Sequence, residues 1–155
     1  MSEHNVIQMT FDEFGKASGG SKKSGSWYLR SPETIVVVNL QKSQYAVRYY
    51  VNVALWLLAA GPAEAPKTPQ CHVQTRLDGL VPPALEERLT ALLDLGSPID
   101  EKARREELLA LLRAHLLPLM QASLSLESLR SGAGQELVRK SLVTGPGQQV
   151  LAAGS

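Results

Sequence analysis

The chain has 155 residues, of which 44% are apolar, a length and composition typical of one folded domain with a substantial core. Its 16 lysines and arginines nearly balance its 15 aspartates and glutamates, so the formal net charge is +1. This balance disfavours nucleic acid and anionic membranes as partners, because both select for a basic excess. We expect one domain over residues 1–155, with about eight N-terminal and about ten C-terminal residues flexible.

Cysteine content and the first residues bear on the compartment. Cys71 is the only cysteine, which excludes an internal disulfide and a multi-cysteine zinc site and agrees with a reducing compartment. The first fourteen residues contain acidic side chains and no apolar run, unlike a secretory signal. The most apolar run, residues 51–60, is about half as long as a membrane-spanning helix requires. We therefore expect a cytoplasmic protein without a membrane anchor.

A short helix is predicted at the N-terminal end. Thr10 and Glu13 have the spacing of a capping box, Met9 and Phe14 occupy the positions of a hydrophobic staple, and Gly15 limits the length of the helix. A polar turn region, SKKSGS, follows. Residues 26–30, SWYLR, then predict an aromatic-rich strand that ends at Ser31-Pro32.

Residues 34–57 predict a two-stranded hairpin, since both halves are rich in β-branched residues. A turn at Ser43-Gln44 would pair Asn39 with Arg48 across the strands. Period-two alternation sorts the side chains into two faces. The core face carries Val36, Val38, Leu40, Val47, Tyr49, Val51, Val53 and Leu55. The opposite, polar face carries Ile35, Val37, Asn39, Gln41, Arg48, Tyr50 and Asn52. A slip of one residue would bury Arg48, so the faces are well specified.

A fourth strand is predicted over residues 71–78, after a loop at 61–70 that contains three prolines. Alternation puts one set of its side chains on the core face: Cys71, Val73, Thr75 and Leu77. The other set extends the polar face: His72, Gln74, Arg76 and Asp78. On the core face Cys71 is interpreted as a small buried residue rather than a nucleophile.

The second half of the chain is predicted to be helical. Leucines spaced at helical intervals follow Pro82-Pro83 as far as Gly96. A longer helix is expected over residues 98–117, with Ser97 as its N-cap and Pro118 either kinking or ending it. Its buried stripe comprises Leu108, Leu109, Leu112, Leu116 and Leu119. A short helix or turn over residues 123–132, a helix over 135–142 and an extended tail over 144–155 complete the chain. Strands first and helices after predict an α+β fold: an antiparallel β-meander of about four strands with helices packed on one face.

Several of these residues form a pattern seen in a known family. Asn39-Leu40-Gln41-Lys42-Ser43, then Tyr45, Tyr49-Tyr50-Val51-Asn52 and later Cys71-His72, Arg76 and Leu77 resemble a bacterial family catalogued as domain of unknown function 4304. The similarity spans roughly residues 20–117. Ser21 departs from it, because the family tends to carry an aromatic residue there, and the first helix is shorter than usual. The resemblance implies a shared fold and assigns no activity.

The candidate site is the polar face of the sheet. Its candidate ligand-binding residues are Asn39, Gln41, Arg48, Tyr50, Asn52, His72 and Arg76. The leading hypothesis is a binding or interaction module whose partner is an unknown protein or a small anionic ligand, acting as a monomer or a homodimer. The simpler interpretation is an ordinary solvated face, since exposed sheet residues are usually polar. Asn and Gln favour a binding role, because they form strands poorly and their amides recognise hydrogen-bonding partners.

An enzyme is the alternative. A hydrolase or transferase acting on an anionic substrate would use His72 as acid or base and Arg48 and Arg76 as charge stabilisers. Nothing in the sequence names a cofactor: no phosphate loop or dinucleotide fingerprint opens a helix, and His4, His72 and His115 do not suggest a metal triad. The binding hypothesis therefore expects no catalytic residues, no metal and no cofactor. The enzyme hypothesis requires His72 to lie beside the two arginines.

Overall fold

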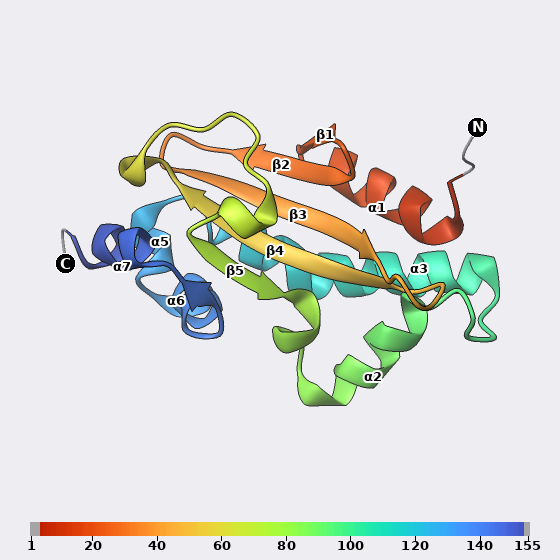
Figure 1. Ribbon diagram of the computed structural model, residues 1–155. Helices are drawn as coiled ribbons and strands as arrows, with labels where there is room; N and C mark the ends of the chain where they lie inside the picture. The colour runs from red at the N-terminus through yellow and green to blue at the C-terminus, as the bar shows by residue number, and fades with distance from the viewer. Residues whose placement is uncertain (1–3, 154–155) are drawn as a thin grey trace.

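The computed structural model describes residues 4–153. Figure 1 shows a twisted sheet with its helices mainly behind and at the ends. In the described part of the chain the sheet has six strands whose order follows the chain, each antiparallel to the next. The strands are β1 (Ser21–Lys23), β2 (Ser26–Arg30), β3 (Thr34–Lys42), β4 (Tyr49–Leu57), β5 (Val73–Arg76) and β6 (Leu142–Val143). The α+β meander is confirmed, with more strands than the four expected.

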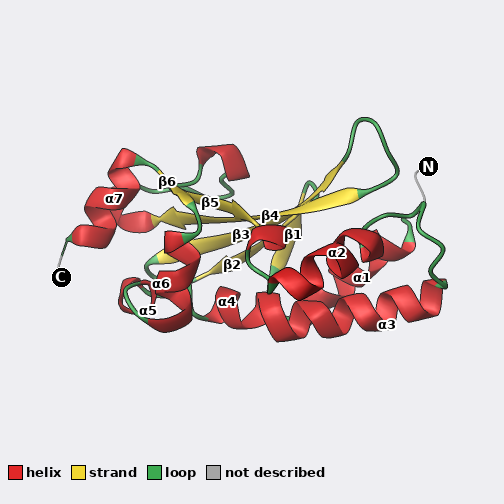
Figure 2. Cartoon of the chain, turned by 90° about the horizontal axis from the view of Figure 1, so that it is seen from below, coloured by secondary structure: helices red, strands yellow, loops and turns green. Residues whose placement is uncertain are grey.

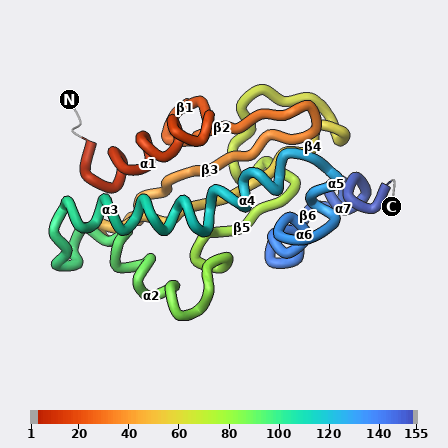
Figure 3. Tube along the Cα trace, turned by 180° about the vertical axis from the view of Figure 1, so that it is seen from behind, coloured from red at the N-terminus to blue at the C-terminus, as the bar shows by residue number. Residues whose placement is uncertain are grey.

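Helices form the second layer. Seen from below, α1, α2, α3 and α4 lie on one side of the sheet, and α7 lies beyond its far end (Figure 2). The helices are α1 (Val6–Ala17), α2 (Pro83–Leu92), α3 (Glu101–Leu111), α4 (Leu117–Gln121), α5 (Leu126–Leu129), α6 (Gly132–Arg139) and α7 (Gly145–Ala152). From behind, α3 and α4 cross the sheet as one continuous path (Figure 3).

The strand faces follow the predicted alternation. Six of the predicted core residues are buried beneath the helices: Val36, Val38, Tyr49, Val51, Val53 and Leu55. Leu40 is half-buried at the edge of the same cluster. The prediction for Val47 is wrong, because this residue lies in the loop before β4 and its side chain is 52% exposed.

The predicted turn of the β3–β4 hairpin is also wrong. Asn39 faces Asn52, not Arg48, and the two strands are joined by a loop over residues 43–48. The start of β4 instead pairs with a distant segment: the Tyr49 N–H donates to the Leu93 carbonyl, and Arg48 bridges Asp94 through the backbone. The pairing differs from the predicted one by four positions, an even number, so every strand residue keeps its face.

The first helix begins earlier than predicted. Asn5 is its N-cap, and the capping box joins Asn5 to Gln8 rather than Thr10 to Glu13. Thr10 lies inside the helix, where its buried hydroxyl donates to the Val6 carbonyl. Met9 is 59% exposed and forms no staple. The helix therefore gains a full turn, and its buried face joins the core beneath the sheet.

The long helix is interrupted as Pro118 requires. Asp100, not Ser97, is the N-cap, since its carboxylate accepts the Ala103 N–H at 3.1 Å. A π-helical turn over Leu112–Leu116 links α3 to α4, with the Leu117 N–H donating to the Leu112 carbonyl. Proline cannot donate to the helical ladder, and the wider turn before it lets the helix continue to Gln121. The predicted leucine stripe is buried except for Leu119, which is half-buried.

The C-terminal segment differs from the expected extended tail. The predicted helix over residues 135–142 is α6, which ends earlier, and Leu142–Val143 forms β6 against β5. Thr144 caps α7 by accepting the Gly147 N–H at 3.2 Å, and Arg130 donates to the carbonyls of Val150 and Leu151. Tertiary contacts thus stabilise a helix whose own sequence, with two glycines and a proline, disfavours one.

Candidate binding site on the polar face of the sheet

The face opposite the helices is covered over one part only. The segment between β4 and β5 crosses in front of β2, β3 and β4 (Figure 1). Tyr28 anchors it, because its hydroxyl donates to the Pro66 carbonyl at 3.2 Å. Beneath the segment lies a second buried cluster, formed by Tyr28, Ile35, Val37, Ala54 and Cys71. This cover explains why Ile35 and Val37 are apolar on a face that is otherwise polar.

Cys71 belongs to this second cluster, not to the helix-covered core as alternation predicted. The reason is that β5 begins only at Val73, so the alternation does not extend back to Cys71. The thiol is fully buried, and burial raises its pKa to about 12. It is therefore a packing residue, as predicted, and remains in the unreactive thiol form at neutral pH.

On the open part of the face, side-chain amides form a continuous chain across three strands. Asn52 donates to Asn39 Oδ1 at 3.1 Å and to Gln41 Oε1 at 2.9 Å. Asn39 in turn donates to Ser26 Oγ at 3.0 Å. Because both N–H groups of Asn52 are engaged, its amide is held in one orientation, and its carbonyl oxygen has no partner among residues 4–153.

Two arginines lie over one tyrosine ring beside this amide chain. The guanidinium carbon of Arg76 is 4.6 Å from the centroid of Tyr50, and that of Arg48 is 5.6 Å from the same centroid. Arg76 also donates twice to the carboxylate of Asp78, at 3.2 and 3.0 Å. Arg48 has no ion pair with any residue that the structure describes. The two cations therefore differ: one is neutralised and one is free.

Arg48 carries a further anomaly. Its Nε atom is buried and lacks a hydrogen-bond partner, the one such side-chain nitrogen or oxygen within residues 4–153. Arg48 also lines a cavity of about 40 Å³, whose other lining residues include the polar Tyr50, Asp78 and Thr90 and the apolar Val51, Leu77, Leu89 and Leu93. An unpaired buried donor costs about 1 to 3 kcal/mol, and the described residues supply no acceptor for this one.

A larger open hollow of about 500 Å³ lies next to the amide chain. Residues of β3, β4, β5 and β6 line it, together with the 68–69 segment and the turn after β5. The lining residues are Gln41, Asn52, Val53, Thr68, Pro69, Gln74, Thr75, Arg76, Asp78, Gly79 and Leu142. Gln74 is held by hydrogen bonds to the carbonyls of Cys71 and Pro69, at 2.9 and 3.2 Å. The volume is within the range of small-ligand sites.

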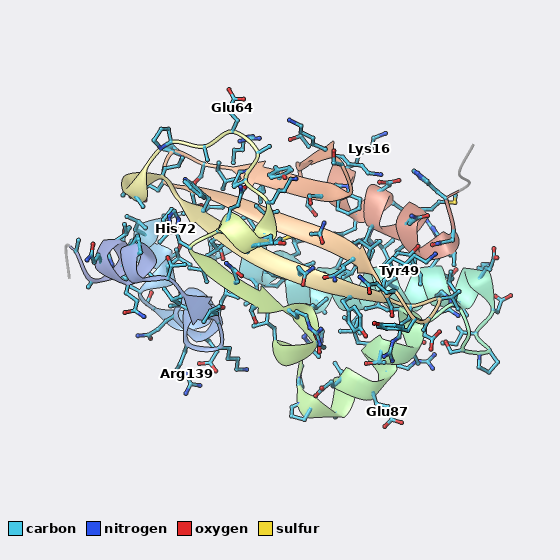
Figure 4. The ribbon with its side chains drawn as sticks, in the orientation of Figure 1. Lys16, Tyr49, Glu64, His72, Glu87 and Arg139 are labelled. Carbon is cyan, nitrogen blue, oxygen red and sulfur yellow. The ribbon has the colours of Figure 1, made fainter. Side chains whose placement is uncertain are left out.

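His72 lies apart from these residues. Its Nδ1 accepts the Leu57 N–H at 2.9 Å, and its ring packs 4.4 Å from that of Trp56. Burial lowers the pKa of this imidazole. Four residues separate His72 from Arg76, about 13 Å in an extended strand. Figure 4 shows His72 and Tyr49, the neighbour of Arg48, toward opposite ends of the sheet.

The structure thus groups six of the seven predicted site residues and separates His72. Asn39, Gln41 and Asn52 form the amide chain, Tyr50 and Arg76 adjoin it, and Arg48 lies over the same tyrosine ring as Arg76. The candidate set missed Gln74 and Asp78, although alternation had placed both on this face. It also missed the 68–69 segment, whose sequence carries no periodic signal.

Other kinds of site find no support in the described residues. Within 4–153, no group of three or more His, Cys, Asp or Glu side chains is arranged to hold a metal ion. None of the helices described there combines the length and apolar character needed to cross a membrane.

Comparison with known proteins places this sheet in a family. Neither the curated proteins nor the solved structures include a match. A family model matches residues 12–122, from within α1 to the residue after α4, and so includes the amide chain, both arginines and every residue that lines the hollow except Leu142. Helices α5 to α7 and β6 lie outside the matched region. Because the match covers well over half of the sequence, the chain belongs to the family described as Domain of unknown function (DUF4304).

Proposed function

We propose that this chain is a binding module that holds a small polar ligand in the hollow on the polar face of its sheet. The observation that carries the proposal is the pre-oriented amide groups at the hollow. Asn52 and Gln74 are each fixed by two hydrogen bonds through their nitrogen, which leaves the amide oxygens of both without a partner in residues 4–153. Groups fixed before binding lose little conformational entropy when a ligand arrives.

The size of the site suits a small ligand. The hollow is open to solvent and about 500 Å³ in volume, and the 68–69 segment lines part of it. Its lining mixes amides, two threonines and one neutralised ion pair with the exposed apolar side chain of Leu142. Such a site suits a ligand with several hydrogen-bonding groups and a short apolar part.

The hydrolase or transferase alternative requires a different arrangement. His72 would have to approach Arg48 or Arg76, yet it packs on Trp56 with Nδ1 already engaged by the backbone. No nucleophile adjoins the hollow with a base in hydrogen-bond reach among the described residues. Binding without chemistry is therefore the function that this geometry supports best.

A screen by nuclear magnetic resonance tests the proposal. We would titrate the ¹⁵N-labelled protein with free amino acids, nucleoside monophosphates and small carboxylic acids, and follow the side-chain amides of Asn52, Gln41 and Gln74. At least one compound should shift these signals saturably. Asn52→Ala should weaken that binding about tenfold, the effect of losing one or two hydrogen bonds, whereas Gln121→Ala, at an exposed site on α4, should not. Signals that stay unmoved with every compound, or that move only elsewhere, would contradict the proposal.

A further inference from the structure

We infer that Arg48 is the anion-binding group of this site and that the ligand bears a carboxylate, which enters the cavity beside Tyr50 while the rest of the ligand occupies the hollow. The inference rests on the proposed function and specifies its ligand class. It starts from charge. Arg48, Arg76 and Asp78 surround Tyr50 and sum to a single positive charge, because Arg76 and Asp78 neutralise each other.

The chain offers no partner for that charge. Asp94 is the backbone neighbour of Arg48, but its Oδ1 accepts the Gly96 N–H at 2.8 Å, and it forms no ion pair with Arg48 in the part of the chain described. Two other surface arginines pair with carboxylates, Arg88 with Glu107 and Arg105 with Glu13. Arg48 is instead held against an aromatic ring, a position that orients a guanidinium without consuming its N–H donors.

The size of the cavity selects the kind of anion. About 40 Å³ is available beside Arg48, and one water molecule needs about 10 to 15 Å³. The space therefore admits a small group of a few heavy atoms, such as a carboxylate. A planar carboxylate also matches the fork of N–H donors on a guanidinium. One of its oxygens would accept the Nε–H that the free protein leaves unpaired, and the other would accept an Nη–H of the same guanidinium.

The cavity and the hollow are close enough for one ligand. Asp78 lines both, and Arg76, which lines the hollow, packs on Tyr50, which lines the cavity. A ligand whose carboxylate meets Arg48 can thus extend past the tyrosine ring to the oxygens of Asn52 and Gln74. The site accordingly fits a small carboxylic acid with an amide or amine group, such as an amino acid derivative or the end of a peptide.

A matched pair of probes tests this inference. N-acetylglycine and N-acetylglycinamide share a body and differ in the carboxylate. We would titrate each at constant ionic strength and follow two sets of signals: the Arg48 Nε–H, and the side-chain amides of Asn52 and Gln74. N-acetylglycine should shift both sets and bind about tenfold more tightly than the amide, the effect of one charge-assisted hydrogen bond.

Variants separate the guanidinium from general charge. Arg48→Gln should remove the preference for the carboxylate, and Arg48→Lys should weaken it, because an ammonium group lacks the Nε donor. Arg30→Gln is the control, since Arg30 also lies over a tyrosine, with its guanidinium carbon 5.5 Å from the Tyr28 centroid, but away from the cavity. Thermal melts of all three variants establish that they are folded.

The outcomes distinguish the two proposals. Equal binding of the two probes, or unchanged affinity in Arg48→Lys, would overturn the carboxylate assignment while the amide signals still supported a polar ligand in the hollow. Failure of both probes to shift the Asn52 and Gln74 amide signals would overturn the inference, because no part of the ligand would then occupy the hollow. A larger effect of inorganic phosphate than of N-acetylglycine on the Arg48 Nε–H would overturn the choice of anion.

Discussion

Asn5 and Tyr49 join the start of α1 to the start of β4: the Asn5 side-chain amide donates to the Tyr49 hydroxyl at 2.9 Å. The tyrosine ring below this bond is buried among the helices. Tyr49 therefore belongs to the core, whereas its neighbour Arg48 lies on the polar face.

This contrast predicts opposite effects of two adjacent substitutions. Tyr49→Ala should lower the free energy of unfolding by about 3 to 5 kcal/mol, as a large aromatic truncation in a core does. Tyr49→Phe should cost only about 1 kcal/mol, the value of one hydrogen bond. Arg48→Ala should stay within about 1 kcal/mol of the wild type. Urea unfolding measures all three. A larger loss of unfolding free energy in Arg48→Ala than in Tyr49→Ala would show that the two faces of the sheet are assigned the wrong way round.

Gly15 is predicted to be intolerant of any side chain. A Cβ atom at this position would lie 2.1 Å from Cδ1 of Trp27, a buried ring that cannot withdraw. Alanine would raise helix propensity by about 1 kcal/mol, but overpacking of this severity costs about 1 to 3 kcal/mol or more. We expect Gly15→Ala to lower the melting temperature. Gly79→Ala, where a Cβ meets nothing within 4 Å, is the control and should melt like the wild type.

Arg104 should be the most important arginine for stability. Its guanidinium is 2% exposed and donates to the carbonyls of Ala91, Leu92 and Ser97 at 3.0, 2.7 and 3.0 Å. Arg104→Ala should cost about 3 to 5 kcal/mol, because two carbonyls at the end of α2 and the carbonyl of Ser97 each lose a donor. Arg105→Ala breaks an exposed pair with Glu13 and should cost less than about 1 kcal/mol. Comparable losses in chemical denaturation would refute this difference.

The stability of the protein should depend on His72 below neutral pH. Burial lowers the pKa of His72 from its usual 6.5, so the unfolded chain takes up this proton at a higher pH than the folded one. The neutral imidazole thus contributes its full stability above pH 6.5, and that contribution falls as the pH drops from 6.5 toward the lower folded pKa. Unfolding free energies measured across this range should decline less steeply in His72→Asn. Identical slopes for both proteins would exclude His72 as the cause.

The Cys71 thiol should react only when the protein unfolds. Burial raises its pKa to about 12, and the side chain is fully covered. Native protein should therefore resist a disulfide reagent such as Ellman's reagent, while denatured protein should release one equivalent of the coloured product. Rapid labelling of the folded protein would show that the segment covering the second cluster opens readily.

The alternation of side chains along each strand was the basis for most of the correct predictions. Val36, Val38, Val51 and Val53 lie on the core face because side chains two apart always point the same way. The turn could not be predicted in the same manner. Residues 43–48 adopt a long loop because Val47 and Tyr49 pair with Leu95 and Leu93, more than forty residues further along the chain.

Local signals were less informative at helix ends. Both Thr10 and Asn5 are followed three residues later by a side chain able to complete a capping box, and only the burial of Ile7 and Phe11 makes the earlier start favourable. The helix α7 was not predicted at all, since it depends on Arg130, the residue after α5, which donates to the carbonyls of Val150 and Leu151.

By itself, the sequence determined the α+β class, the family and the set of residues that share the polar face, because these properties depend on periodicity and on short motifs. Only the tertiary structure decided which part of that face stays open. The covering segment has no periodicity, and its position depends on contacts such as that of Tyr28 with Pro66, across 38 residues. The meeting of Arg48 and Arg76 on one tyrosine ring has the same origin: two strands bring together side chains that no local pattern relates.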